Sequence, residues 1–160
     1  MGADQTAGSG AKVPPRWFIL TAWQVHRALY RVSGGRLGLR RPKPGAFGMM
    51  RMHTTGRRSG RDRAVIVAYF EDGPNVVTLA MNGWGDPPPA WWLNLQANPD
   101  ATVILPGDDR RRVRAREATG SEHARLWDTF RTQFGEGSDL DALARLRSRP
   151  TPVVVLEPAP

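Results

Sequence analysis

Six stretches of this chain combine apolar side chains with a strand-like pattern, either alternating with polar residues or running together. Stretches rich in Val, Ile and aromatic residues and bounded by Gly, Pro, Asn and Asp are typical of β-strands joined by turns. The pattern predicts strands at about residues 47–54, 64–70, 75–81, 101–106, 110–118 and 152–156. Turns are predicted at Asp72–Asn75 and Gly107–Asp109.

Apolar residues three or four positions apart predict helices between these strands. Over residues 16–32 the apolar face consists of Phe18, Ala22, Val25, Leu29 and Val32. This helix either packs on the core or lies on an anionic membrane surface, since its other face is basic. Further helices are predicted at residues 88–97 with Pro88 and Pro89 in the first turn, at 121–134 with Ser121 as the cap, and around 140–144.

Strands in hairpins, with few helices between them, argue against a doubly wound parallel sheet. We expect a mainly β fold with packed helices (α+β), built as an antiparallel barrel with the helices outside. The expected organisation is a disordered tail at residues 1–15, an amphipathic helix and linker at 16–46, and one barrel domain at 47–160.

Composition excludes several kinds of site. The chain has 160 residues and no cysteine, which rules out disulfides and thiolate metal sites. The three histidines, His26, His53 and His123, are far apart, so no metal is expected. No apolar run has the length of a membrane-spanning helix, and the polar first residues lack a signal-peptide core, so a cytoplasmic protein is expected.

The net charge of +8 is unevenly distributed along the chain. Residues 1–63 carry thirteen Lys and Arg against two acids, whereas residues 64–160 carry ten Arg against thirteen acids. Such asymmetry indicates an anionic partner for the first part of the chain: a cofactor phosphate, a membrane surface or a nucleic acid.

The segment Thr54–Arg63 concentrates this charge between two predicted strands. Gly56 and Gly60 allow a tight connection, and four arginines fall within seven residues: Arg57, Arg58, Arg61 and Arg63. Guanidinium groups bind phosphate and carboxylate oxygens in a bidentate manner. The loop therefore predicts a site for a polyanionic ligand, although a solvated hairpin would have the same local sequence.

A second segment, residues 81–99, contains three of the six tryptophans in a Gly- and Pro-rich context. Glycine in the loop permits close approach of a flat ligand, and an indole could cover one of its ring faces. Trp91 and Leu95 share a helix face, and Asn94 lies near enough to hydrogen bond to such a ligand. The alternative is that Trp91 and Trp92 only anchor a short helix to the barrel.

Together the two segments resemble the deazaflavin (F420)-dependent nitroreductase family. The matching motifs, in order over about residues 16–158, are His26–Arg31, Gly34–Gly38, Thr54–Gly60, Ala90–Pro99 and Arg149–Pro158. The resemblance implies a split β-barrel of the FMN-binding type. It also implies coenzyme F420, an 8-hydroxy-5-deazaflavin with an anionic tail, and hydride transfer from the reduced coenzyme to a quinone, enone or nitroaromatic compound.

The resemblance also assigns residues. Those implied to bind the phosphate and tail are Arg57, Arg58, Ser59 and Arg63, and those implied to line the ring are Ala80, Asn82, Gly83, Trp91 and Asn94. Tyr69 matches a tyrosine near the active site and could donate a proton, but solvent could do so, and Tyr69 could be an ordinary barrel residue. Met81 and Trp84 replace smaller residues near the substrate, and residues 133–140 lack the tyrosine cluster of the prodrug-activating member.

Three other interpretations remain open from the sequence. The barrel could bind FMN, the less favoured cofactor, in place of F420. It could also carry the cofactor without catalysis. A basic nucleic-acid-binding module would use the arginines on phosphates and the tryptophans for stacking. We do not expect a nucleic-acid partner, because the tryptophans of residues 81–99 lie outside the basic segment.

Overall fold

The computed structural model describes residues 38–83, 85–133 and 139–160. The strands are β1 Gly48–Thr55, β2 Asp62–Asp72, β3 Asn75–Leu79, β4 Asp100–Leu105, β5 Asp109–Glu117 and β6 Val153–Pro158. The helices are α2 Ala90–Ala97, α3 Gly120–Gln133 and α4 Leu140–Arg145. The expected tail at 1–15 and the expected helix at 16–32 lie outside the described residues.

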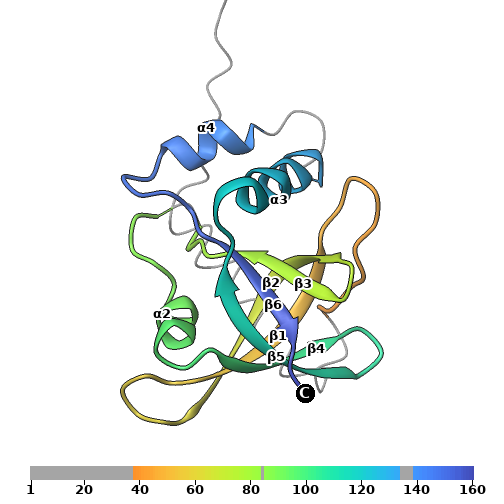
Figure 1. The fold of residues 1–160 in the computed structure, drawn as a ribbon, viewed down its shortest axis with the longest axis vertical. Helices are drawn as coiled ribbons and strands as arrows, with labels where there is room; N and C mark the ends of the chain where they lie inside the picture. The colour runs from red at the N-terminus through yellow and green to blue at the C-terminus, as the bar shows by residue number, and fades with distance from the viewer. Residues whose placement is uncertain (1–37, 84, 134–138) are drawn as a thin grey trace, which may run out of the picture.

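The six strands form one closed antiparallel barrel in the order β1-β2-β3-β6-β5-β4 (Figure 1). Hairpins join β1 to β2, β2 to β3 and β4 to β5, as the turn residues predicted. β6 comes from the end of the sequence and inserts between β3 and β5. The pairing of β1 with β4 closes the barrel. The predicted fold class is therefore confirmed.

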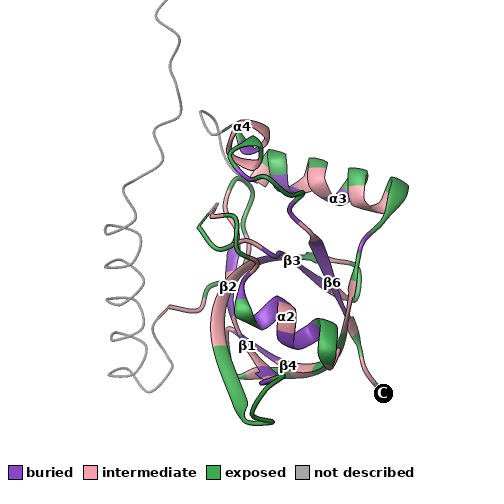
Figure 2. Ribbon diagram, turned by 90° about the vertical axis from the view of Figure 1, so that its left-hand side faces the viewer, coloured by how far each residue is buried: buried purple, intermediate pink, exposed green. Residues whose placement is uncertain are grey.

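Two apolar clusters lie on opposite faces of the barrel wall. The inner cluster includes Met50, Met52, Val103 and Leu156, and α2 adds Trp91, Trp92 and Leu95 to it. The outer cluster lies beneath α3 and α4 and includes Phe70, Val77, Leu126, Phe130 and Val155. Figure 2 shows α2 across the barrel and α3 and α4 at one end.

Strand β6 belongs to both clusters, which explains its composition. Val154 and Leu156 face the barrel interior, whereas Val153 and Val155 face α3 and α4. Because successive side chains of a strand point to opposite faces, a strand that is covered on both sides must be apolar throughout. Each of these buried side chains contributes about 1.5–3 kcal/mol relative to an exposed one.

The helix boundaries differ from the predictions at two points. Helix α2 begins at Ala90 with Pro89 as the N-cap, so Pro88 and Pro89 precede the helix and do not form its first turn. Helix α3 begins at Gly120, which places Ser121 inside the helix and not at its cap. The reason is that Gly120, with φ of 56°, turns the chain one residue earlier than expected.

No helix in the described part of the chain is long and apolar enough to cross a membrane.

Candidate active site

A cavity of about 920 Å³ opens where the β2–β3 ladder ends. Strand β2 has 11 residues and β3 has five, and they pair only between Phe70–Asp72 and Asn75–Val77. From Ala64 to Ala68, β1 is the only described strand that pairs with β2. The second edge of β2 therefore borders the cavity.

Five parts of the chain line this cavity. They are the β2 edge, the end of β3 with the loop after it, the start of α2, the segment before β1 and the end of α3. The lining residues are Arg40, Gly45, Ala46, Phe47, Met49, Ala64, Val65, Ile66, Val67, Ala68, Thr78, Leu79, Met81, Asn82, Gly83, Pro89, Ala90, Trp91, Asn94, Phe130 and Gln133. A concave, mostly apolar site with a few polar groups is typical of a small-molecule or cofactor site.

The edge of β2 that no described strand pairs with presents peptide groups at this cavity. Alternate peptide groups of an antiparallel strand point to the same side, and an unpaired edge presents N–H donors and C=O acceptors. One of them is already satisfied, because the Thr78 hydroxyl donates to the Ala68 carbonyl at 2.7 Å where a β3 amide would otherwise pair. A flat heterocycle with amide-like edges could hydrogen bond to the remaining groups.

The ring and substrate residues that the family resemblance implied line this cavity, apart from Ala80 and the undescribed Trp84. Asn82, Gly83, Trp91 and Asn94 line it, and Met81 does so as well. Ala80 is fully buried behind the wall and does not line the cavity. Trp84 lies outside the described residues.

The arginine loop between β1 and β2 is a compact turn. Gly56 N–H donates to the Arg61 carbonyl at 2.8 Å, and Gly60 N–H donates to the Gly56 carbonyl at 2.7 Å. Gly60 has φ of 65°, in the left-handed region that favours glycine. The turn forces successive side chains outward, so Arg57, Arg58 and Ser59 are all exposed.

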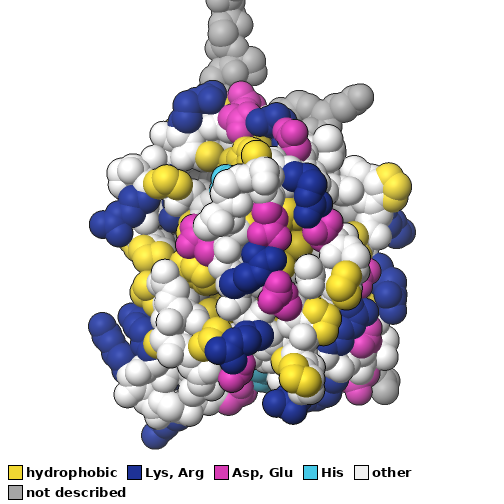
Figure 3. Space-filling view, viewed as in Figure 1, with side chains coloured by type: hydrophobic (Ala, Val, Ile, Leu, Met, Phe, Trp, Pro, Cys, Tyr) yellow, Lys and Arg dark blue, Asp and Glu magenta, His cyan; other side chains and the backbone are white. Residues whose placement is uncertain are grey.

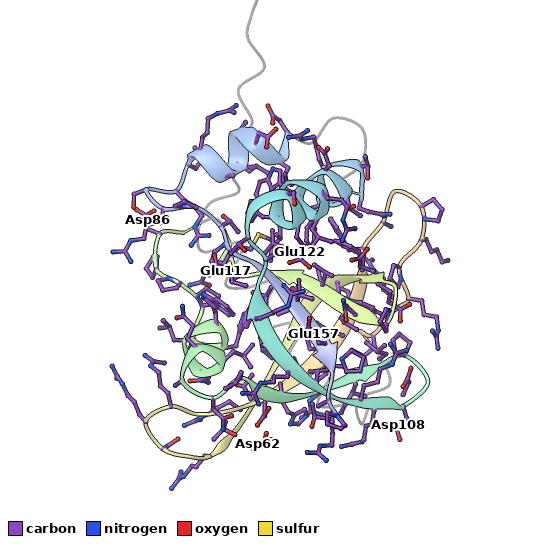
Figure 4. The ribbon with its side chains drawn as sticks, viewed as in Figure 1. Asp62, Asp86, Asp108, Glu117, Glu122 and Glu157 are labelled. Atoms are coloured by element: carbon purple, nitrogen blue, oxygen red, sulfur yellow. The ribbon has the colours of Figure 1, made fainter. Side chains whose placement is uncertain are left out.

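The loop arginines keep their charge free for a ligand. No described residue pairs with the guanidinium groups of Arg57, Arg58, Arg61 or Arg63. The nearby acid Asp62 is engaged by the His53 ring, with Nδ1 and Oδ2 2.8 Å apart. Figure 3 shows basic side chains at this corner, and Figure 4 shows Asp62 at the base of the loop.

Asn94 connects the loop to the cavity. Its side chain is buried and lines the cavity. Its Oδ1 accepts a hydrogen bond from Arg57 N–H at 3.1 Å. Its Nδ2 donates to the Thr54 hydroxyl at 3.2 Å. The arginine loop and the cavity are therefore parts of one contiguous site.

Tyr69 lies away from this site. Its side chain is fully buried in the inner cluster and is not among the cavity-lining residues. A Cβ at Gly48 would collide with its ring, so the glycine makes room for it. Burial, followed by the charge of Glu71, raises the pKa of the Tyr69 hydroxyl. This is the position of an ordinary barrel residue, the alternative that the sequence left open.

Several lining residues had not been singled out from the sequence. Phe47 and Phe130 contact each other, with ring centroids 5.5 Å apart, and form one wall. Gln133 lies one turn after Phe130, and its Oε1 is buried with no donor among the described residues. Apolar spacing predicted the helix at 121–134 that carries Phe130, but no local signal distinguishes Gln133 from a surface glutamine.

A closed barrel has a mostly apolar cavity beside an arginine loop with no ion-pair partner for its guanidinium groups among the described residues. Together these features define a class of protein: a barrel oxidoreductase for a flat, anionic redox cofactor. The family profile described as F420H(2)-dependent quinone reductase matches residues 22–158. The chain belongs to this family.

Individual relatives agree with the family assignment. An F420H(2)-dependent quinone reductase of Mycobacterium tuberculosis is 35% identical over 136 residues, which cover 83% of this chain and 87% of the relative. A solved F420-H2 dependent reductase, FDR-A, is 25% identical with a TM-score of 0.60 over 75% of this chain and all of its own. A structure described as a domain-swapped dimer is 25% identical with a TM-score of 0.62, over 90% of this chain and all of its own.

These comparisons confirm the main prediction from the sequence. The protein is an oxidoreductase of an F420H2-dependent family, and coenzyme F420 is its cofactor. The interpretation with FMN is not supported by the family assignment.

Proposed function

We propose that this protein transfers a hydride from reduced F420 to a quinone or a similar electron-poor conjugated acceptor, such as an enone or a nitroaromatic compound. The observation that carries the proposal is the position of Asn94, which lines the cavity and also hydrogen bonds to the arginine loop. A cofactor with a flat ring and an anionic tail needs such a junction between an apolar cavity and a cationic surface.

The residues present fit this cofactor. The ring would lie along the edge of β2 that borders the cavity, with Asn82, Gly83 and Trp91 around it. The phosphate and tail would extend over Arg57, Arg58, Ser59 and Arg63, which are exposed in the described structure. When bound, reduced F420 supplies the hydride, so the protein needs no side-chain nucleophile.

The protein's own part is to orient the two rings and to exclude water. Phe47, Met81 and Phe130 line the cavity and belong to or pack against the outer cluster. An acceptor ring would stack against the cofactor beside these apolar side chains. Gln133 also lines the cavity, and its Nε2 amide group could donate a hydrogen bond to an oxygen of the acceptor. Because Tyr69 is enclosed in the barrel core, we assign the proton to solvent and not to this residue.

The decisive test of this function is a binding comparison. Purified protein is titrated with oxidised F420 and, separately, with FMN while tryptophan fluorescence is followed, since Trp91 lines the cavity. We expect saturable quenching by F420 at far lower concentration than by FMN, and menadione reduction in the presence of F420H2. A protein that binds neither cofactor, or that prefers FMN, would contradict the proposal.

We further propose a cytoplasmic enzyme that contacts membranes through residues 16–32. The basic amphipathic pattern of this segment supports the contact, and quinones are themselves often lipid-soluble. The test compares the full chain with a chain starting at residue 38 for sedimentation with anionic vesicles. Equal sedimentation of the two proteins would contradict membrane contact through this segment.

A further inference from the structure

The turn between α4 and β6 is hydrogen bonded to the loop that forms one wall of the cavity. Ala80 N–H donates to the Pro152 carbonyl at 2.9 Å. Arg147 Nη1 donates to the Ala80 carbonyl at 3.3 Å. Ser148 N–H donates to Asp86 Oδ1 at 2.6 Å. Figure 4 shows Asp86 beside the chain that leaves α4.

Arg147 is an unusual residue in this position. It is 8% exposed. Nη1 also donates to the Thr151 hydroxyl at 2.7 Å, while Nε is buried with no acceptor among the described residues. In the described ranges no acid forms an ion pair with it. Hydrogen bonds from Ser148, with a smaller contribution from the Arg147 charge, lower the pKa of the Asp86 carboxyl. A buried cation with no acid at ion-pair distance costs free energy, and an apolar residue of similar volume often gives equal or greater stability. An apolar residue could not supply the hydrogen bonds from Nη1 to the Ala80 carbonyl and the Thr151 hydroxyl.

The segment that Arg147 holds turns directly into the cavity. Met81 N–H donates to the Leu79 carbonyl at 2.9 Å, which makes a tight turn centred on Ala80. Gly85 N–H donates to the Asn82 carbonyl at 3.0 Å and closes the loop. The three residues that follow Ala80, namely Met81, Asn82 and Gly83, all line the cavity.

We propose that Arg147 is a positioning residue for the cofactor site, and that with Asp86 it clamps the Ala80–Asp86 loop at both ends. This inference rests on the proposed function, because it takes the cavity to be the F420 site. Arg147 itself is not among the residues that line the cavity. It fixes the Ala80 carbonyl, and thereby sets where the residues at 81–83 meet the cofactor ring. A misplacement of about 1 Å in a positioning group can cost on the order of 100-fold in activity.

The test uses the full-length protein with Arg147→Met, Arg147→Lys and the control Arg145→Met, which replaces an exposed arginine of α4. We expect Arg147→Met to raise the Kd for F420 about tenfold or more, equivalent to about 1.4 kcal/mol. Arg147→Lys should recover part of the affinity, because an ammonium group can still donate to the Ala80 carbonyl. Arg145→Met should match the wild type. Equal Kd values in Arg147→Met and Arg145→Met would overturn the inference.

A second variant tests the same proposal even if Arg147→Met fails to fold. Asp86 is exposed, so Asp86→Ala removes only the other end of the clamp. We expect Asp86→Ala to bind F420 more weakly with an unchanged Tm. In the double variant Asp86→Ala/Arg147→Met, the two effects on affinity should not be additive, as is usual for residues that act on one loop. Unchanged affinity in Asp86→Ala, or additive effects in the double variant, would contradict the clamp.

Amide hydrogen exchange separates this inference from the proposed function. Without any cofactor, exchange in the Ala80–Asp86 segment should accelerate in Arg147→Met and Asp86→Ala but not in Arg145→Met. If the wild type fails to bind F420, the proposed function fails while the exchange result still tests the clamp. Exchange that is identical in all variants would refute the clamp whatever the ligand.

Discussion

The side chain of Asn94 accepts a hydrogen bond from the backbone N–H of Arg57 at 3.1 Å, across a separation of 37 residues in the chain. Helix α2 thereby sets the position of the arginine loop. Because Asn94 also lines the cavity, any shift of α2 moves both halves of the site together.

Removing the hydrogen bond between Asn94 and Arg57 should lower the stability of the fold and weaken cofactor binding. Asn94→Leu leaves the Arg57 N–H without its acceptor, at a cost of about 1–3 kcal/mol in the free energy of unfolding. It also removes the donor to the Thr54 hydroxyl, which keeps its own bond to the Arg63 carbonyl. The Kd for F420 should rise as well, because the loop is no longer fixed. Denaturant unfolding and fluorescence titration measure the two effects. Gln96→Leu, at an exposed position of the same helix, is the control. If Asn94→Leu lowers stability but leaves the Kd for F420 unchanged, Asn94 has only a structural role.

The positive charge of the arginine loop should strengthen binding of the cofactor's anionic tail. Arg58→Ala should weaken F420 binding by about 1.5–3 kcal/mol if a charged hydrogen bond is lost. Added salt should weaken the wild type more than the variant, because ions screen exposed charges. Arg112→Ala, which removes an exposed arginine of β5, serves as the control. If Arg57→Ala, Arg58→Ala and Arg63→Ala all bind like the wild type, the loop is not the tail site.

The size of Met81 should restrict the acceptor. Met81 lies in the cavity wall near Phe47, and the family resemblance places a smaller residue there. We expect menadione reduction by the wild type and little turnover of bicyclic nitroimidazoles. Met81→Ser should raise nitroimidazole turnover more than menadione turnover. Steady-state assays with the same F420H2 stock decide this, and brisk nitroimidazole turnover by the wild type would show that Met81 does not narrow the site.

Two carboxylates that hold α3 to the barrel should give the fold an acid-sensitive component. Hydrogen bonds from Arg125 lower the pKa of Asp72, and those from Arg116 lower the pKa of Glu122. A carboxyl group with a lowered pKa in the folded state adds stability above its ordinary pKa of 3.8 or 4.5, and this stability is lost as pH falls through the lowered value.

The unfolding free energy should therefore begin to fall below about pH 5, and should continue to fall below the ordinary pKa values of 3.8 and 4.5. In Arg125→Met the fall should be shallower, because the Asp72 pKa returns toward its ordinary value. Urea unfolding at a series of pH values measures the slope. Arg112→Met is the control, and a slope in Arg125→Met equal to that of the control would exclude the Asp72–Arg125 pair as a source.

Much of the fold follows from local patterns. Strand periodicity and turn residues locate all six strands of the barrel within a few residues, and the Gly-bounded run of arginines marks an exposed cationic loop. Helix boundaries were less accurate, because Gly120 and Pro89 act one or two residues away from where propensity places the cap. The family resemblance, and not periodicity, supplied the cofactor.

The sequence by itself determined which segments are strands, which loop is cationic and which helix carries the tryptophans, because these depend on neighbouring residues. Only the tertiary structure decided that β6 inserts between β3 and β5, and that the β2–β3 ladder stops early enough to open a cavity. It also placed Tyr69 in the core, Asn94 beneath the arginine loop and Arg147 behind the cavity wall. The physical reason is that a two-residue period tells which side chains share a face, but not which strand lies alongside or which face is enclosed. Those choices are made by contacts between residues far apart in the chain.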